Sequence, residues 1–250
     1  MVYVQKRQEL NLILDQSSSL KVGEVLAFHE LSSLRVLKIS NISSLESLDL
    51  HSFVALEELI IKGCQSLTSL IFGEHLVRLR RLEIISCNKT LSSMEDLRSW
   101  VNLKCLYFRE CPGFIEAWDS ASKEIERTEP DFSLSLRKIH GDSLALLTLP
   151  ICKQLTSLQT FILEVSAFTE EEEISLQLLT SIDLVDIRGC KKNLQSFPFD
   201  LFPSLKKLTI TFPCIKSPPT HSHTEIIEEC KKLRNFKKVD MTTLPVEVII

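Results

Sequence analysis

Large apolar residues recur along the chain in the spacing L-x-x-L-x-I, in which positions one, four and six are apolar and most intervening residues are polar. The alternation at positions four and six is the period of a β-strand with one buried face. Each copy therefore predicts a short strand whose apolar positions face a core. The copies begin at Leu34, Leu56, Leu79, Leu103, Leu136, Leu158, Ile182 and Leu205.

Successive copies start 22, 23, 24, 33, 22, 24 and 23 residues apart, and 23 of the 24 defining positions are apolar, with Gly141 as the exception. A regular step of this length is typical of proteins in which stacked units bury one another's apolar edges. We predict an α/β solenoid, a leucine-rich-repeat horseshoe. Its concave face is a curved parallel sheet of about eight to ten short strands, and its convex face carries irregular or short helical segments.

Two further marks accompany the strands. A large apolar residue stands three residues before the start of seven copies, where we expect it to pack the returning segment onto the strands: Leu31, Phe53, Leu76, Trp100, Leu155, Leu179 and Phe202. Five residues after position four, five copies carry a residue expected to be buried at the turn that leaves the strand: Ile42, Cys64, Cys87, Cys111 and Cys190.

The repeat suggests one domain over residues 1–250. Residues 1–33 form a degenerate first unit, residues 34–227 hold eight repeats, and residues 228–250 form a charged C-terminal cap. The single 33-residue step contains an insert at 116–131 with six acids and two bases. We predict that this insert is a solvated loop whose shortening the fold tolerates.

Composition narrows the function classes. Of the 250 residues, 41 are leucine and 44% are hydrophobic, and the net charge is -4. That balance argues against a partner held by its phosphates, so we expect no nucleic-acid ligand. The chain has no uninterrupted apolar run long enough for a membrane span, no secretory h-region and no CxxC pair. We expect a cytoplasmic protein with reduced thiols and no membrane partner.

Residues with reactive or metal-binding side chains are few. Cys214, His221, His223 and Cys230 have ligand types suited to zinc, but their spacing matches no familiar zinc site. Cys105 and His140 lie on neighbouring predicted strands, yet no third group orients them as a nucleophile and base. No GxxxxGK[ST] phosphate loop is present. We therefore predict no enzymatic activity, no cofactor and no metal.

The stretch from Leu56 to Leu70 resembles the irregular L-x-x-L-x-I-x-x-C-x-x-L-x-x-L repeats of plant intracellular nucleotide-binding leucine-rich-repeat immune receptors of the coiled-coil type. The stretch from Leu149 to Phe161 is similar to the linkers of that family. The resemblance implies a C-terminal sensor or autoinhibitory domain. Its partner would be a pathogen effector, a host intermediary or the receptor's own nucleotide-binding domain.

A second family also carries cysteine-marked repeats. F-box adaptors of ubiquitin ligases use such repeats to bind substrates, so substrate recognition in a ubiquitin ligase is the alternative function. Their units are usually nearer 26 residues and have a cysteine before the first leucine. This chain lacks both features.

Several outward positions of the predicted strands are apolar, namely Ile60, Ile85, Tyr107 and Ile162. Around them we expect a charged border of Lys62, Glu83, Arg109, His140, Glu164, Asp186 and Arg188. Exposed apolar patches rimmed by charges commonly mark protein interfaces. The sequence therefore predicts a partner-binding site on the concave face.

Overall fold

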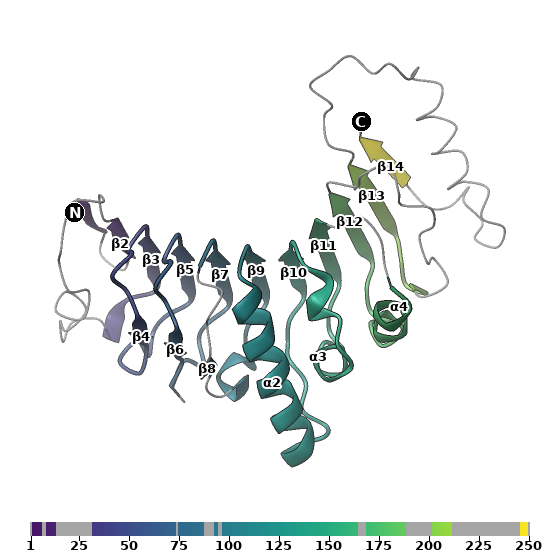
Figure 1. The fold of residues 1–250 in the computed structure, drawn as a ribbon, viewed down its shortest axis with the longest axis horizontal. Coiled ribbons are helices and arrows are strands. Elements are labelled where there is room, and N and C mark those ends of the chain that lie inside the picture. The colour runs from purple at the N-terminus through teal and green to yellow at the C-terminus, as the bar shows by residue number, and fades with distance from the viewer. Residues whose placement is uncertain are drawn as a thin grey trace.

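The chain is built on one large sheet whose strands follow each other across the molecule (Figure 1). The computed structural model describes residues 2–6, 9–13, 32–73, 75–87, 93–94, 97–164, 169–188, 202–211 and 246–249. Eleven strands lie in the order β1-β2-β3-β5-β7-β9-β10-β11-β12-β13-β14. Strands β1 (Val2–Lys6) and β2 (Glu9–Ile13) pair antiparallel, whereas β2 pairs parallel with β3 (Val36–Ser40).

The remaining strands of the large sheet are parallel to β3. They are β5 (Glu58–Lys62), β7 (Arg81–Ile85), β9 (Cys105–Arg109), β10 (Lys138–Gly141), β11 (Thr160–Glu164), β12 (Leu184–Arg188), β13 (Lys207–Thr211) and β14 (Val246–Ile249). Each of the eight strands β3, β5, β7, β9, β10, β11, β12 and β13 contains positions four and six of one predicted copy, so the eight predicted strands are confirmed.

Positions four and six form two rows of core side chains on one face of the sheet. Leu37, Leu59 and Leu82 are direct partners on β3, β5 and β7, and each is fully buried. Pairing in one register keeps every apolar residue on the same face, since a slip of one residue would turn it to the other. The predicted α/β class is confirmed, but the sheet is not curled, so the horseshoe curvature is not confirmed.

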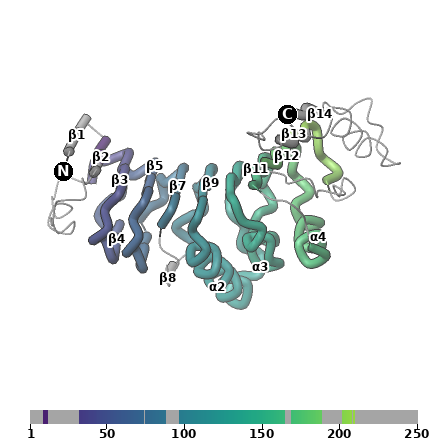
Figure 2. Tube along the Cα trace, turned by 45° about the horizontal axis from the view of Figure 1, so that its top comes forward, coloured from purple at the N-terminus to yellow at the C-terminus, as the bar shows by residue number. Residues whose placement is uncertain are grey.

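A second layer covers the apolar face. The part of this layer nearer the N-terminus of the chain is a small parallel sheet of β4 (Ser47–Asp49), β6 (Ser69–Ile71) and β8 (Ser93–Met94). Helices continue it along the same side of the large sheet (Figure 2). They are the 3₁₀ helices η2 (Leu97–Trp100) and η3 (Leu144–Leu146) and the α-helices α2 (Pro112–Thr128), α3 (Leu149–Gln154) and α4 (Glu170–Leu176).

The prediction that the insert at 116–131 is a solvated loop is wrong. Residues 112–128 form α2, a helix that packs against the core. Pro112 begins the helix at a position where a missing N–H costs nothing. Apolar residues recur at helical spacing, and Phe114, Trp118 and Ile125 are buried. The Trp118 ring lies 5.8 Å from the ring of Trp100, and buried Ser122 donates to Gln154 of α3 at 3.1 Å. Most acids and bases of α2 are exposed, whereas Asp119 is 18% exposed and accepts from Thr148 Oγ1 at 2.6 Å.

The apolar residues three positions before the copies pack as predicted. Phe53, Leu76 and Leu155, for example, are at most 2% exposed. Each also accepts a backbone hydrogen bond from the first residue of its copy, as Phe53 O does from Leu56 N at 3.0 Å. This four-residue turn places the first residue of each copy two residues before the start of its strand, as Leu56 precedes β5.

A left-handed residue ends four consecutive strands, at Asn41, Gly63, Ser86 and Glu110, with φ between 49° and 64°. At Gly63 a Cβ would meet the side-chain oxygen Asn41 Oδ1 at 2.4 Å, so a larger residue there would have to displace the Asn41 side chain. The next residue in each copy is buried, as predicted for Ile42, Cys64, Cys87 and Cys111. Cys111 Sγ donates to Arg109 O at 3.0 Å and accepts from Cys87 N at 3.3 Å, so the thiol satisfies backbone groups at the turn.

Several predictions lie outside the described residues. These are Leu31, Cys190, most of the first unit at 1–33 and most of the cap at 228–250. Within the described parts, no helix combines the length and the apolar composition needed to cross a membrane.

Candidate functional site

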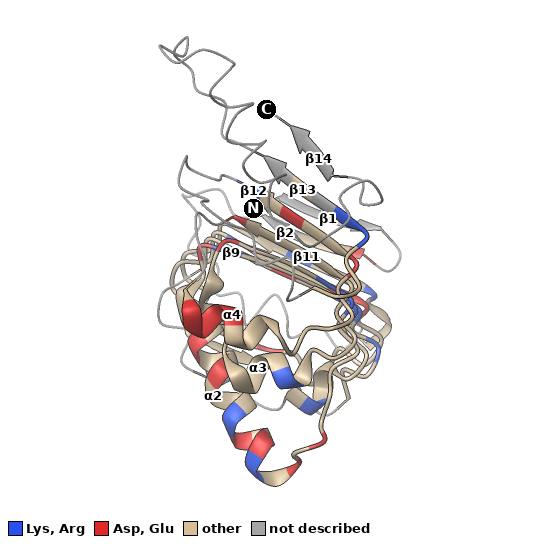
Figure 3. Ribbon diagram, turned by 90° about the vertical axis from the view of Figure 1, so that its right-hand side faces the viewer, with Lys and Arg blue, Asp and Glu red and all other residues tan. Residues whose placement is uncertain are grey.

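The strand register places polar and aromatic residues on the face of the large sheet turned away from the helices. No described helix or strand lies over this face (Figure 3). We call it the open face. Its middle row is formed by residues that are direct partners on successive strands: Lys38, Ile60, Glu83, Tyr107, His140, Ile162, Asp186 and Thr209. A flanking row, two residues further along each strand, contains Ser40, Lys62, Ile85, Arg109, Glu164 and Arg188.

All eleven predicted site residues lie on this face, but the predicted exposed apolar patch is wrong. Ile60 is 9% exposed and Ile162 is 6% exposed, while Ile85 and Tyr107 are half-buried. The reason is the register. Each middle-row residue has a neighbour about 4.8 Å away on both sides. Ile60 lies between Lys38 and Glu83, and Ile162 lies between His140 and Asp186.

Glu83 also separates Ile60 from Tyr107 in the middle row, so the apolar residues form no continuous track. Glu83 is itself only 6% exposed. Lys62 Nζ lies 2.7 Å from one of its carboxylate oxygens and Arg81 lies 3.0 Å from the other. Burial alone would raise the pKa of Glu83, but the hydrogen bonds from Lys62 and Arg81 outweigh it and lower that pKa. This half of the open face is internally paired.

The half formed by β9 to β12 differs because its polar atoms are incompletely paired. The rings of Tyr107 and His140 meet edge to face with centroids 4.3 Å apart. Beyond Ile162, both Nε and an η nitrogen of Arg188 donate to Asp186 Oδ2, at 3.0 and 2.8 Å. The Asp186 side chain is 13% exposed. We call Tyr107, His140, Ile162 and Asp186 the central site.

Two atoms of the central site are buried without a hydrogen-bond partner in the described part of the chain. They are His140 Nε2 and Asp186 Oδ1. Glu164 Oε1 lies 3.8 Å from His140 Nε2, which is too long for a hydrogen bond. An unpaired buried polar atom costs roughly 1–3 kcal/mol. A molecule that reached these atoms and supplied the missing partners would offset that cost.

Burial lowers the pKa of His140 below its usual 6.5, and the nearby positive charge of Arg188 lowers it further. Glu164 and Asp186 act in the opposite direction without reversing the shift. The imidazole is therefore neutral at neutral pH. It offers one donor and one acceptor nitrogen, and it adds no positive charge to the site.

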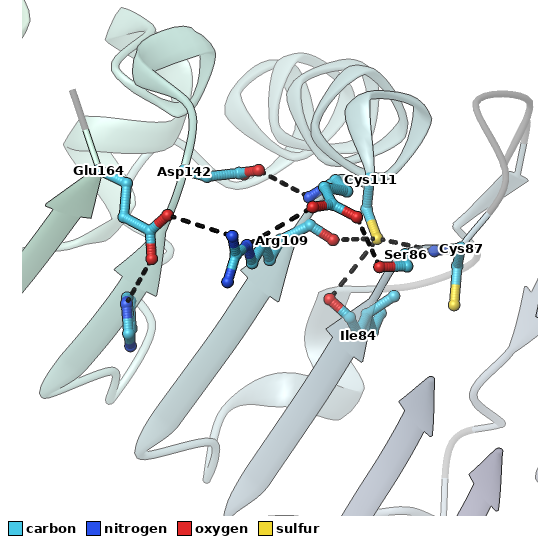
Figure 4. A network of polar contacts seen from close by, with 9 residues as sticks. Ile84, Ser86, Cys87, Arg109, Cys111, Asp142 and Glu164 are labelled. Carbon is cyan, nitrogen blue, oxygen red and sulfur yellow. Dashed lines mark hydrogen bonds and ion pairs between the residues drawn. The ribbon is translucent and has the colours of Figure 1, made fainter. Parts of the chain in front are cut away.

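A polar network runs from the central site to the edge where the strands end (Figure 4). Arg109 lies 3.8 Å from Glu164 and 3.6 Å from Glu110. Glu110 Oε2 accepts from Ser86 Oγ at 2.6 Å, and the Glu110 N–H donates to Asp142 Oδ2 at 2.7 Å. At the earlier turns a backbone carbonyl of the next strand accepts this hydrogen bond, as Arg109 O accepts from Ser86 N. At Glu110 the Asp142 side chain accepts it instead.

Other chemistry suggested by the sequence finds no support here. Cys105 is the partner of Lys138, whereas His140 is the partner of Tyr107, so the thiol and the imidazole are not paired across the strands. No cluster of metal-ligating side chains is found among the described residues. Cys214, His221, His223 and Cys230 lie outside them. A scan against protein-family models finds no match, and neither does a search of curated proteins.

Sequence reasoning named every member of the central site but not its distinguishing property. His140 and Asp186 entered the prediction as parts of a charged border around apolar anchors. In the structure both lie in the middle row of the open face, with Ile162 between them on β11. Both residues stand at position five of their copies, and this shared position could have placed them in one row of the sheet.

Proposed function

We propose that the chain is a protein-recognition module that binds a protein partner through the central site. The observation that carries this proposal is the pair of unpaired buried atoms, His140 Nε2 and Asp186 Oδ1, on a sheet face that none of the described helices or strands covers. Such atoms are ordinarily satisfied in native proteins. A partner that places hydrogen-bonding groups above Ile162 recovers the cost of leaving them unpaired.

The surroundings suit a protein rather than a small molecule. The half-buried ring of Tyr107 packs against His140, and the exposed guanidinium groups of Arg109 and Arg188 lie beside the site. Tyrosine and arginine are the side chains that most often dominate binding at protein interfaces. The middle row of the open face runs across eight strands, which gives a surface broad enough for a protein partner.

The family assignment is part of the proposal. The repeat steps and cysteine marks resemble those of plant intracellular nucleotide-binding leucine-rich-repeat receptors. We therefore propose a leucine-rich-repeat solenoid that serves as the cytoplasmic sensor or autoinhibitory domain of such a receptor. The parallel strands in chain order support a solenoid. The partner would then be a pathogen effector, a host intermediary or the receptor's own nucleotide-binding domain.

Affinity capture from infected and healthy plant tissue tests this function. The bait is the 250-residue chain, compared with a Tyr107→Ala/Asp186→Ala variant and a control variant, Lys123→Ala/Arg127→Ala, on the exposed side of α2. A partner retained by the control and lost by the first variant supports the proposal. Capture that depends on neither pair, or on the control pair alone, contradicts it.

A further inference from the structure

A second surface lies where the strands begin, away from the central site. In each copy the residue after position one sits at this edge, and backbone hydrogen bonds link it to the same residue of the next copy. Lys104 N donates to Arg80 O, and Arg137 N donates to Lys104 O, both at 2.9 Å. Arg80, Lys104 and Arg137 are therefore consecutive along the edge, about 4.8 Å apart from strand to strand.

The next position adds more positive charge. Arg81 and Lys138 are the partners of Cys105 on its two sides. We call Arg80, Lys104, Arg137 and Lys138 the basic strip. Arg81 borders it but is committed to Glu83 at 3.0 Å. Figure 3 shows Lys and Arg along this edge of the sheet.

The charges of the basic strip have no salt-bridge partner in the part of the chain that the structure describes. Most other lysines and arginines on the strands and helices do form a salt bridge. Arg80, Arg137 and Lys138 are exposed, and Lys104 is partly exposed. In a chain of net charge -4, four like charges across three strands repel one another. An anionic partner relieves that repulsion.

Acidic residues bound the strip on both sides. On the β5 side it meets Glu57, whose pKa is lowered first by its hydrogen bond with Arg35 and also by Arg80. On the other side, Gln159 follows Arg137 and Asp183 follows Gln159. The positive surface is therefore only about 10 Å long from strand to strand. A nucleic acid carries phosphates well beyond that length and would meet these carboxylates.

We infer that the basic strip binds a short, acidic, extended polypeptide segment. Alternate side chains of an extended segment are about 6.6–6.8 Å apart, so two or three carboxylates span the strip. Arg80 and Arg137 can each hold a carboxylate with two parallel N–H donors. This inference does not depend on the proposed function, because the strip and the central site share no residue.

The test uses fluorescence anisotropy with three labelled probes of about 12 units, a length chosen to exceed the strip. They are a peptide of alternating Glu and Ser, the same peptide with Gln for Glu, and an oligothymidylate. The protein is the 250-residue chain, the Arg80→Gln/Lys104→Gln/Arg137→Gln variant, and a control, Lys123→Gln/Arg127→Gln/Lys153→Gln. The control removes the same charge from α2 and α3, where each cation is already paired.

We expect the Glu peptide to bind the wild-type chain and the control about equally, and the strip variant about tenfold more weakly. We also expect the Gln peptide to bind poorly and added salt to weaken the Glu peptide. Equal binding by the strip variant, an equal loss in the control, or tighter binding of the oligothymidylate would overturn the inference. If thermal melting shows that the triple variant is destabilised, single Lys104→Gln and Arg137→Gln variants replace it, each with an expected loss of about threefold.

Discussion

The ring of Phe108 fills the space that a side chain at Gly141 would occupy. A Cβ on Gly141 would come within 2.1 Å of Phe108 Cζ, and Phe108 is only 1% exposed. Both residues stand at position six, on the neighbouring strands β9 and β10. The one glycine among the 24 defining positions is therefore explained by the large ring beside it.

This relationship predicts a compensated pair of substitutions. Gly141→Ala forces the buried ring of Phe108 to move and should lower the free energy of unfolding by about 1–3 kcal/mol. Adding Phe108→Leu makes room, so the double variant should be more stable than Gly141→Ala alone. Urea denaturation of the wild-type chain, both single variants and the double variant measures this coupling. Strictly additive losses would show that the two residues do not compete for space.

The helix α2 should contribute substantially to stability. Trp118 packs against Trp100 and Phe114 with ring centroids about 6 Å apart and is fully buried. Trp118→Ala should therefore lower the free energy of unfolding by about 3–5 kcal/mol. Glu124→Ala, on the exposed side of α2, should change it by less than about 0.5 kcal/mol. Similar small effects of both changes in chemical denaturation would restore the loop interpretation of residues 116–131.

The strand register predicts opposite tolerance at adjacent positions. Leu106 is 1% exposed on the core face, whereas Tyr107 lies on the open face. Leu106→Asp buries an unpaired charge at a cost of several kcal/mol and should abolish the folded state. Tyr107→Ala should keep native far-ultraviolet circular dichroism and a cooperative melt. A reversed result would place β9 one residue out of register.

Much of the fold could be predicted from the sequence because the repeat shows which residues of each strand face the core. Equivalent residues of successive copies then pair with one another on neighbouring strands. The helix at 112–128 was missed because the insert was assessed by its charges. The helical spacing of Phe114, Trp118 and Ile125 was the better indicator. The burial of Ile60 and Ile162 could not be predicted, because it depends on how far the side chains of neighbouring strands extend over them.

The state of the central site was even less accessible to sequence reasoning. Whether His140 Nε2 and Asp186 Oδ1 find partners depends on side-chain orientations that no spacing encodes. Asp186 directs one oxygen to Arg188 and leaves the other unpaired. The types of the site residues were predictable, but their hydrogen bonding was not.

The lowered pKa of His140 predicts a loss of stability on acidification. The unfolded chain takes up a proton near pH 6.5, whereas the native chain resists it to lower pH, so the free energy of unfolding falls as pH decreases through 6.5. One such group contributes a slope of at most about 1.4 kcal/mol per pH unit. His140→Gln should flatten the profile as the pH falls through 6.5, measured by urea denaturation. His75→Asn, at an exposed turn, serves as the control. An unchanged slope in His140→Gln would refute the assignment.

Calorimetric titration of the captured protein partner against open-face variants tests the recognition account most directly. Tyr107→Ala and Asp186→Ala should each weaken binding by about tenfold or more, because anchors at the centre of an interface supply most of its energy. Lys123→Ala and Arg127→Ala, on the outer side of α2, should leave the dissociation constant unchanged. If instead the α2 variants weaken binding and the Tyr107 and Asp186 variants bind like the wild-type chain, the central site is not where the partner binds.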